Sequence, residues 1–169
     1  MNKKTRQYLG LLCAVLAYYI IHEGAHLAYA LLTGTFRQIR LIGLGIQVDV
    51  YGERMSQSQM GMFCLAGPIA TVVAAWLLTG FTGKILTAKS KVFRACMYYV
   101  TAALLFVDPI YLCFLYRLVG GGDMNGISLL LPEPAVQIIS GAVLMLHIGL
   151  FLQWFYPKYK KSFERGDRQ

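Results

Sequence analysis

The sequence predicts an all-α polytopic membrane protein, with about four transmembrane helices and a short membrane-associated β-hairpin after the first. Hydrophobic residues make up 57% of the 169 positions and charged residues only 14%, which is too apolar for a soluble domain of this size. The apolar residues also gather into four stretches, and each is long enough to supply the roughly 20 residues of a spanning helix.

The four predicted spans fill most of the chain and leave almost nothing for a soluble domain. They cover residues 8–33, 59–80, 95–119 and 134–156. The first span follows a basic start, as a secretion signal does, but it is too long for one and lacks a convincing small-residue cleavage site. We therefore expect it to be retained, in a single integral-membrane domain over residues 1–169.

The net charge of +8 indicates topology rather than nucleic-acid binding, because the basic residues lie at the ends of the spans. Three groups, at residues 3–6, 84–94 and 158–168, hold 12 of the 16 cations. With four spans all three groups fall on one side, which the positive-inside rule makes cytoplasmic. We expect a multi-pass protein with both termini in the cytoplasm, and its compactness and basic tail suit a bacterial cell membrane.

Residues 35–54, between the first two spans, have the pattern of a β-hairpin. Ile46, Val48 and Val50 alternate with more polar neighbours, which is the period of a strand. Glycines just before this strand permit a tight reversal.

Prolines and glycines mark the later spans. Pro68 and Pro109 lie inside the second and third spans, and each frees a backbone carbonyl that must find another partner in lipid. After the third span, residues 120–126 predict a flexible polar turn.

The run His22-Glu23-Gly24-Ala25-His26 is an H-E-x-x-H motif inside the first span. On a helix, histidines at i and i+4 share one face and can reach a single Zn²⁺ at about 2.0 to 2.1 Å. Glu23 then lies where it can take a proton from metal-bound water, whose pKa the metal lowers to roughly 7. A chance match is less plausible, because three ionisable side chains on one intramembrane turn are poorly tolerated without compensation. We expect one Zn²⁺ per chain, with Glu23 as the catalytic base.

A catalytic zinc normally has three protein ligands, so a third must come from elsewhere in the chain. The candidates are Asp108, Asp123, Glu133 and His147. The two motif histidines lie roughly 21 to 27 Å from the cytoplasmic start of their span, in its outer half. Asp123 follows the third span on that side, and Asp108 lies roughly 20 Å into its helix, so depth leaves both aspartates open. Glu133 reads as a loop charge and His147 as a packed polar residue.

The order of these features resembles the site-2 protease family of intramembrane metalloproteases. The resemblance runs from about Leu11 to Ile127 and also includes Ala66-Gly67-Pro68 in the second span. It implies Asp123 as the third zinc ligand, with Asp108 in reserve, because the aspartate of that family lies in a turn after the third span. The family writes this turn Asp-Gly and precedes it with Asn-x-x-Pro, whereas Met124 follows the aspartate here and the Asn-x-x-Pro run is missing.

The resemblance implies hydrolysis of a peptide bond in or near a transmembrane segment of another membrane protein. Expected partners are this protein or peptide substrate and the lipid bilayer, with no nucleic acid and no prediction for oligomeric state. The strand edge at Ile46, Val48 and Val50 is a candidate to pair with an extended substrate, or only plugs the membrane surface. Asn125 is a candidate to orient the substrate or the oxyanion. We expect a polar cavity lined by Tyr18, Tyr19 or Tyr29.

Two other functions are compatible with the same residues. The first is a proteolytically inactive membrane scaffold, against which the presence of His22, Glu23 and His26 together argues. The second is a zinc- or proton-coupled transporter, because intramembrane ionisable residues also mark ion paths. Four spans are few for a transporter, and a glutamate beside i, i+4 histidines is better explained by hydrolysis.

Overall fold

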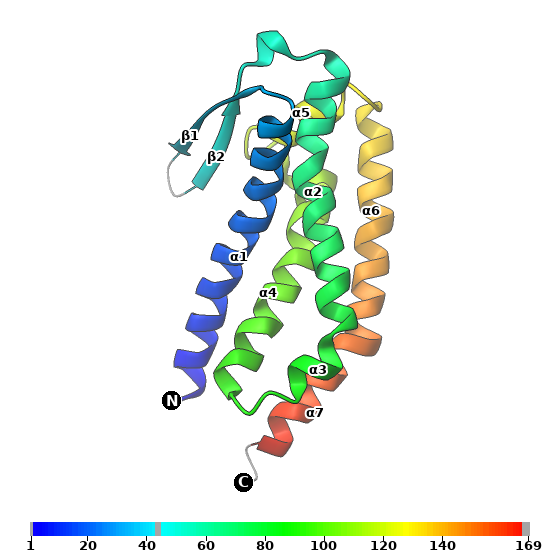
Figure 1. Ribbon diagram of the computed structural model, residues 1–169. Helices are drawn as coiled ribbons and strands as arrows, with labels where there is room; N and C mark the ends of the chain where they lie inside the picture. Colours follow the sequence, from blue (N-terminus) through cyan, green and yellow to red (C-terminus); the bar gives the residue numbers. More distant parts are fainter. Residues whose placement is uncertain (1, 43–44, 167–169) are drawn as a thin grey trace.

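In the computed structural model, which describes residues 2–42 and 45–166, the chain forms a helical bundle with a two-stranded hairpin at one end (Figure 1). Four helical segments are long and apolar enough to cross a membrane, as the sequence predicts. They are Lys3–Leu32, Gln57–Gly80, Lys91–Leu115 and Glu133–Glu164. Their bounds differ from the predicted ones at several ends, and local capping and packing explain the differences.

Helix α1 (Lys3–Leu32) begins before the predicted position 8 because Asn2 caps it. The Asn2 side chain accepts a hydrogen bond from the Thr5 backbone N–H at 2.8 Å, which satisfies one of the free donors of the first turn. The buried side of the helix follows a helical spacing through Gly10, Ala14, His22, His26 and Ala30. Its small residues allow neighbouring helices to approach closely, as is usual between membrane helices.

The predicted hairpin is confirmed: β1 (Phe36–Ile42) and β2 (Gly45–Val50) pair antiparallel. Ile39 lies opposite Val48 in this register. Of the two glycines expected to permit the reversal, Gly45 begins β2 and Gly43 lies outside the described residues. A single 3-10 turn, η1 (Gly52–Arg54), then leads towards the second span.

Helix α2 (Gln57–Gly80) starts with a capping box and is followed by the short α3 (Thr82–Leu86). The Ser56 hydroxyl accepts from the Gln59 N–H at 3.2 Å, and the Gln59 side chain accepts from the Ser56 N–H at 2.9 Å. This reciprocal pair explains why the helix begins slightly before predicted residue 59.

The third span lies earlier in the chain than the predicted 95–119. Ser90 caps α4 (Lys91–Ile110), which continues through a π-helical turn, η2 (Tyr111–Leu115). Gly120 and Gly121 then adopt φ values of 96° and 68°, which glycine reaches without steric cost. The expected flexible turn over 120–126 is wrong in part, because residues Gly122–Ile127 form the short helix α5.

The last span consists of α6 (Glu133–Leu150), a π-helical turn η3 (Phe151–Phe155) and α7 (Tyr156–Gly166). It passes the predicted end at residue 156 because aromatic packing continues there. Phe155 and Tyr159 are fully buried; Phe155 stacks on Tyr98 of α4, and Tyr159 meets the same ring edge-on.

The carbonyl freed by Pro109 finds a partner on another helix. Pro109 has no N–H for the Leu105 carbonyl four residues earlier, and His147 Nδ1 donates to that oxygen at 2.6 Å. The Trp76 indole in turn donates to His147 Nε2 at 2.8 Å. His147 is therefore a packed polar residue, as predicted, and it ties α2, α4 and α6 together.

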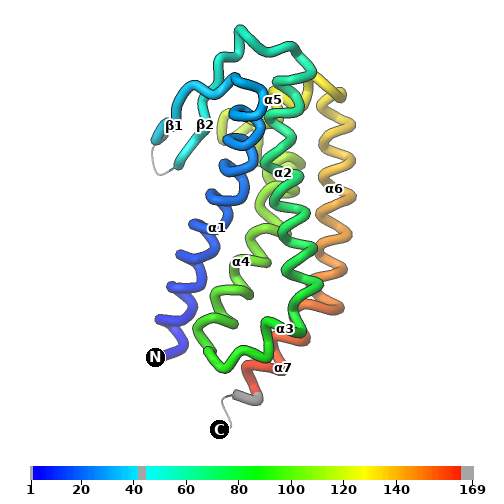
Figure 2. Tube along the Cα trace, in the orientation of Figure 1, coloured from blue at the N-terminus to red at the C-terminus, as the bar shows by residue number. Residues whose placement is uncertain are grey.

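The hairpin, α5 and the H-E-x-x-H motif lie towards one end of the bundle. Helices α1, α2 and α4 contact one another, and α6 packs against α4. Both ends of the described chain lie at the same end of the bundle, while the hairpin and α5 lie at the other (Figure 1, Figure 2). The hairpin and α5 consequently lie beside the later turns of α1, where the H-E-x-x-H motif is found.

Candidate metal centre

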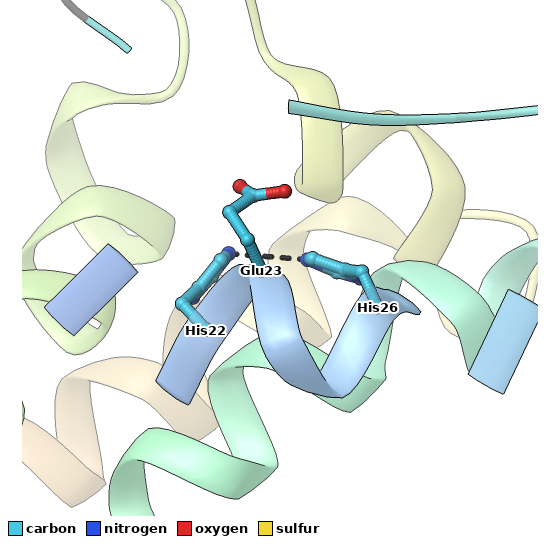
Figure 3. A group of neighbouring side chains, drawn as sticks. All are labelled: His22, Glu23 and His26. Atoms are coloured by element: carbon cyan, nitrogen blue, oxygen red, sulfur yellow. Dashed lines mark hydrogen bonds between the residues drawn. The ribbon is translucent and has the colours of Figure 1, made fainter. Parts of the chain in front are cut away.

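The three motif side chains project from one turn of α1 (Figure 3). His22 and His26 are buried, with 6% and 3% of their surface exposed. Their Nε2 atoms lie only 3.1 Å apart. With Glu23, they form a group whose potential ligand atoms all lie within 4.8 Å of one another, so these residues could hold a metal ion.

Asp123 completes a third side of this cluster. It lies in the first turn of α5, and its Oδ2 is 3.0 Å from His22 Nε2 while its Oδ1 is 3.5 Å from His26 Nε2. Ligand atoms around a tetrahedral zinc lie about 3.3 Å apart if each bond is about 2.05 Å long. The spacing and the donor types, two imidazoles and one carboxylate, therefore fit a zinc ion with one position left for water or substrate.

The other nitrogen of each imidazole also has a partner. His26 Nδ1 lies 2.7 Å from the Phe63 carbonyl, which can only accept, so Nδ1 carries the hydrogen. His22 Nδ1 lies 3.3 Å from the Asp108 carboxylate. Partners of this kind fix the tautomer and orientation of metal-binding histidines. In the neutral imidazoles, the form that binds a metal, both Nε2 lone pairs face the point that the two rings share with Asp123.

Asp108 therefore occupies a different place from Asp123. It is 1% exposed on α4 and accepts hydrogen bonds from Tyr18 at 2.5 Å and from Thr71. Its contact with the motif is to Nδ1 of His22, on the side of the ring away from His26 Nε2. The geometry thus distinguishes the two aspartates. Asp123 lies beside the Nε2 atoms of both histidines, whereas Asp108 contacts, of their ring nitrogens, only Nδ1 of His22.

The histidines also stabilise the charge of Asp123. Burial alone would raise the pKa of this carboxyl, but while the two imidazoles are protonated their hydrogen bonds and positive charge outweigh it and lower the pKa to about 2. Asp123 is consequently an anion at neutral pH, which is the form that binds a metal.

Gly67 of α2 forms the back of the site. A Cβ at this position would lie 2.5 Å from His26 Nε2 and 2.7 Å from His22 Nε2. Any larger residue would occupy space needed by the imidazoles. This close approach explains why the middle residue of the Ala66-Gly67-Pro68 run is a glycine.

Glu23 is held by the hairpin. Its Oε2 accepts a hydrogen bond from the Val48 backbone N–H at 3.0 Å. Val48 itself is buried at 5% exposure and packs in the core, so β2 is anchored where it meets the carboxylate. The bond fixes one oxygen of Glu23 and leaves the other able to act on water.

An open cleft of 580 Å³ reaches the cluster between α1, β2, α4 and α5. His22, Glu23 and Asp123 line it together with Tyr18 and Tyr19. Much of the remaining wall is apolar: Phe106, Val107, Ile110, Leu115 and Val119. A cavity lined by Tyr18 and Tyr19 is present as expected, but its wall is mostly apolar and not polar, and Tyr29 packs against Phe63 instead of lining it.

The predicted substrate-binding residues occupy different places. Ile46 lines the cleft, whereas Val48 is buried and Val50 packs against the core. Asn125 is exposed on α5, and its side chain lies over Gly121. Of these four residues, Ile46 is the one that borders the cleft.

The remaining ligand candidates have other partners. Glu133 accepts from Arg117 at 2.6 Å and from Tyr116, at the start of α6. His147 is fully engaged between Trp76 and Leu105.

Sequence reasoning missed several supporting groups. Tyr18 lies one turn before His22 on the same helix face, a spacing that could have indicated a shared network. Thr71, the Phe63 carbonyl and the Val48 amide come from other elements, and no pattern in the sequence links them to the motif. Comparisons of the chain with protein-family models, with curated proteins and with solved structures find no match.

Proposed function

We propose that this protein is an intramembrane zinc metalloprotease of the site-2 protease type, which hydrolyses a peptide bond in or near a transmembrane segment. The observation that carries the proposal is the cluster of His22 Nε2, His26 Nε2 and the Asp123 carboxylate, with separations of 3.0 to 3.5 Å. Glu23 stands beside this cluster in an open cleft. This is the set of groups that metal-assisted peptide hydrolysis requires.

Each residue has a distinct role in the proposed reaction. His22, His26 and Asp123 would hold one Zn²⁺. When bound, zinc polarises the scissile carbonyl and lowers the pKa of water to roughly 7. Glu23 takes the proton from the attacking water and delivers it to the leaving amine. The Val48 N–H keeps the Glu23 carboxylate in position for both transfers.

Membrane placement is supported by the outward faces of the helices. Many large apolar side chains there are exposed. Such a surface suits contact with lipid and is unfavourable in contact with water. Examples on α1 and α6 are Leu12 at 55%, Leu16 at 54%, Ile20 at 72%, Ile138 at 72% and Met145 at 68% exposure.

The apolar wall of the cleft favours an apolar substrate. Ile46 and Gln47 of β2 border this wall, so an extended peptide could pair with the strand at that point. At Val48 the edge amide already donates to Glu23, and pairing there would compete with the catalytic base. We therefore place the substrate contact of β2 at its Ile46 end.

The decisive experiment measures zinc per chain and cleavage in one set of purified proteins. Wild type is expected to hold about one zinc, His22→Ala to lose it, and Glu23→Gln to keep it. Asp123→Asn removes a ligand and should abolish stoichiometric binding. Asp108→Asn removes only a supporting contact, so zinc affinity should fall about 10- to 100-fold and recover at excess zinc.

Cleavage is then assayed in lipid vesicles against a panel of single-span reporter proteins. Glu23→Gln should lower turnover about 10²- to 10⁴-fold while zinc stays bound, because the general base is lost. A folded wild-type protein without zinc would overturn the proposal and favour a scaffold. Zinc binding with metal flux across the vesicle and no cleavage would favour a transporter.

A further inference from the structure

A second cavity lies at the opposite end of the bundle from the metal centre. It has a volume of 310 Å³ and is enclosed by the start of α1, the first turns of α4 and the length of α7. These elements meet at the end of the bundle where both ends of the described chain lie (Figure 1). None of the residues lining it belongs to the proposed metal site.

The cavity combines positive charge with aromatic walls. Lys3, Arg6 and Lys160 line it, against the single carboxylate of Glu164. Tyr98, Tyr99, Tyr156, Tyr159 and Phe163 supply the aromatic surface. No ion pair joins any of the three cations to another residue in the described part of the chain. The positive charge and the aromatic lining together suit a ligand with an anionic head group and an apolar body.

A buried hydroxyl in the same place supplies a second, independent observation. Tyr159 is 0% exposed, and its hydroxyl has no hydrogen-bond partner among the described residues. Buried polar groups are nearly always paired, because an unpaired one keeps the cost of leaving water. Tyr159 is also one of the residues that line the cavity, so a ligand bound there lies close to this hydroxyl.

We propose that this cavity binds the phosphate headgroup of an anionic membrane lipid. Cations and tyrosines at a membrane surface are common by themselves, but here they enclose a cavity beside an unpaired buried hydroxyl. A lipid is favoured over a soluble phosphate because exposed apolar side chains continue from the cavity along the last span. Tyr156, which lines the cavity, is 42% exposed, and Leu152, one helical turn earlier, is 58% exposed, so acyl chains can lie against them. The proposal depends on membrane insertion but not on zinc or on protease activity.

The test measures lipid binding by native mass spectrometry of the full chain released from detergent. Phosphatidylglycerol, phosphatidylcholine and glycerol phosphate are titrated separately. Wild type should bind a first phosphatidylglycerol at least tenfold more tightly than phosphatidylcholine, and glycerol phosphate only weakly. Tight binding of glycerol phosphate would instead identify a soluble phosphate ligand and overturn the lipid assignment.

Charge substitutions distinguish this cavity from general attraction to an anionic surface. Arg6→Gln with Lys160→Gln removes two lining cations and should weaken phosphatidylglycerol binding about 25-fold, because each such cation contributes roughly fivefold. Lys4→Gln with Lys161→Gln removes two neighbouring cations that do not line the cavity and should change binding less than about twofold. Equal losses in both pairs would overturn the proposal.

The variant Tyr159→Phe keeps the aromatic packing and tests the site even if the charge variants fold poorly. Without lipid its melting temperature should equal or exceed that of wild type, since an unpaired buried hydroxyl is removed. Phosphatidylglycerol binding should weaken about tenfold, because a hydrogen bond to a charged group is lost. An unchanged lipid affinity in this variant would contradict the proposal.

Discussion

Gly67 shows how one missing side chain shapes the proposed metal site. Helix α2 approaches α1 so closely there that a Cβ would lie 2.5 Å from one imidazole nitrogen and 2.7 Å from another. These nitrogens, Nε2 of His26 and Nε2 of His22, are the proposed zinc ligands. The space at Gly67 is therefore part of the site, although glycine contributes no ligand.

Gly67→Ala is expected to displace the imidazoles and lower zinc affinity at least tenfold. The matched control is Gly80→Ala, in the same helix, where a Cβ would meet nothing within 4 Å. Alanine favours the helix at both positions, so a general effect on α2 would be shared. Zinc competition titrations of the two variants check this. Equal zinc affinities would show that a Cβ at residue 67 does not displace the histidines.

The partners of the imidazole Nδ1 atoms also act at the scale of single residues. Asp108 is held by Tyr18 and Thr71 before it meets His22. Its position on α4 is thus fixed by three side chains from two other helices, α1 and α2. A support of this kind keeps His22 oriented when the metal is absent.

At the scale of elements, the hairpin contributes a backbone group to the proposed active site. The Val48 N–H donates to Glu23, and the Val48 side chain is buried in the core beneath. A two-stranded hairpin is marginally stable alone, so this anchoring on α1 is needed to place the amide.

Val48→Pro removes the donor, whereas Val48→Ala keeps it and loses only packing. We expect zinc to remain bound in both variants, and turnover to fall about 10- to 100-fold more in Val48→Pro because the base is no longer oriented. Cleavage assays with zinc content measured in parallel check this. Similar turnover in the two variants would mean that the amide has no part in catalysis.

His147 links three helices through its hydrogen bonds, so a substitution there tests how these elements are held together. His147→Leu leaves the Leu105 carbonyl and the Trp76 indole unpaired inside the bundle, so the free energy of unfolding should fall by about 2 to 4 kcal/mol. Trp76→Phe breaks only one of the two bonds and should cost less. Unfolding of both variants in detergent micelles measures the difference, and zinc affinity is expected to change little.

At the scale of the whole molecule, charge predicts the orientation. Both ends of the described chain lie together, away from the hairpin (Figure 2). The basic groups at that end favour the cytoplasmic side, so we expect the candidate metal centre to lie nearer the outer face.

Cysteine labelling in intact cells tests this orientation after the four native cysteines are replaced. Glu53→Cys, beyond the hairpin, should react with a membrane-impermeant maleimide added outside. Lys4→Cys and Lys161→Cys, at the other end, should react only after permeabilisation. The reverse pattern would show an inverted protein, with its metal centre nearer the cytoplasm.

Composition and spacing along the chain were enough to predict the four long apolar helices, the hairpin and the helical H-E-x-x-H motif. Composition and periodicity are local properties, and they fix local structure with errors mainly at helix ends. Those errors arose where a cap at Asn2, Ser56 or Ser90, or packing around Tyr159, moved a boundary.

The tertiary structure alone decided which atoms meet at the motif. His22 lies 86 residues from Asp108 and 101 from Asp123, and both aspartates reach it. Counting residues along the predicted helices put both aspartates at a similar depth in the membrane, so it did not decide which of them is the third ligand. Only the packing of α4 and α5 around α1 directs Asp108 to Nδ1 and Asp123 to Nε2, because the side of an imidazole that a distant residue reaches depends on helix rotation and not on sequence order.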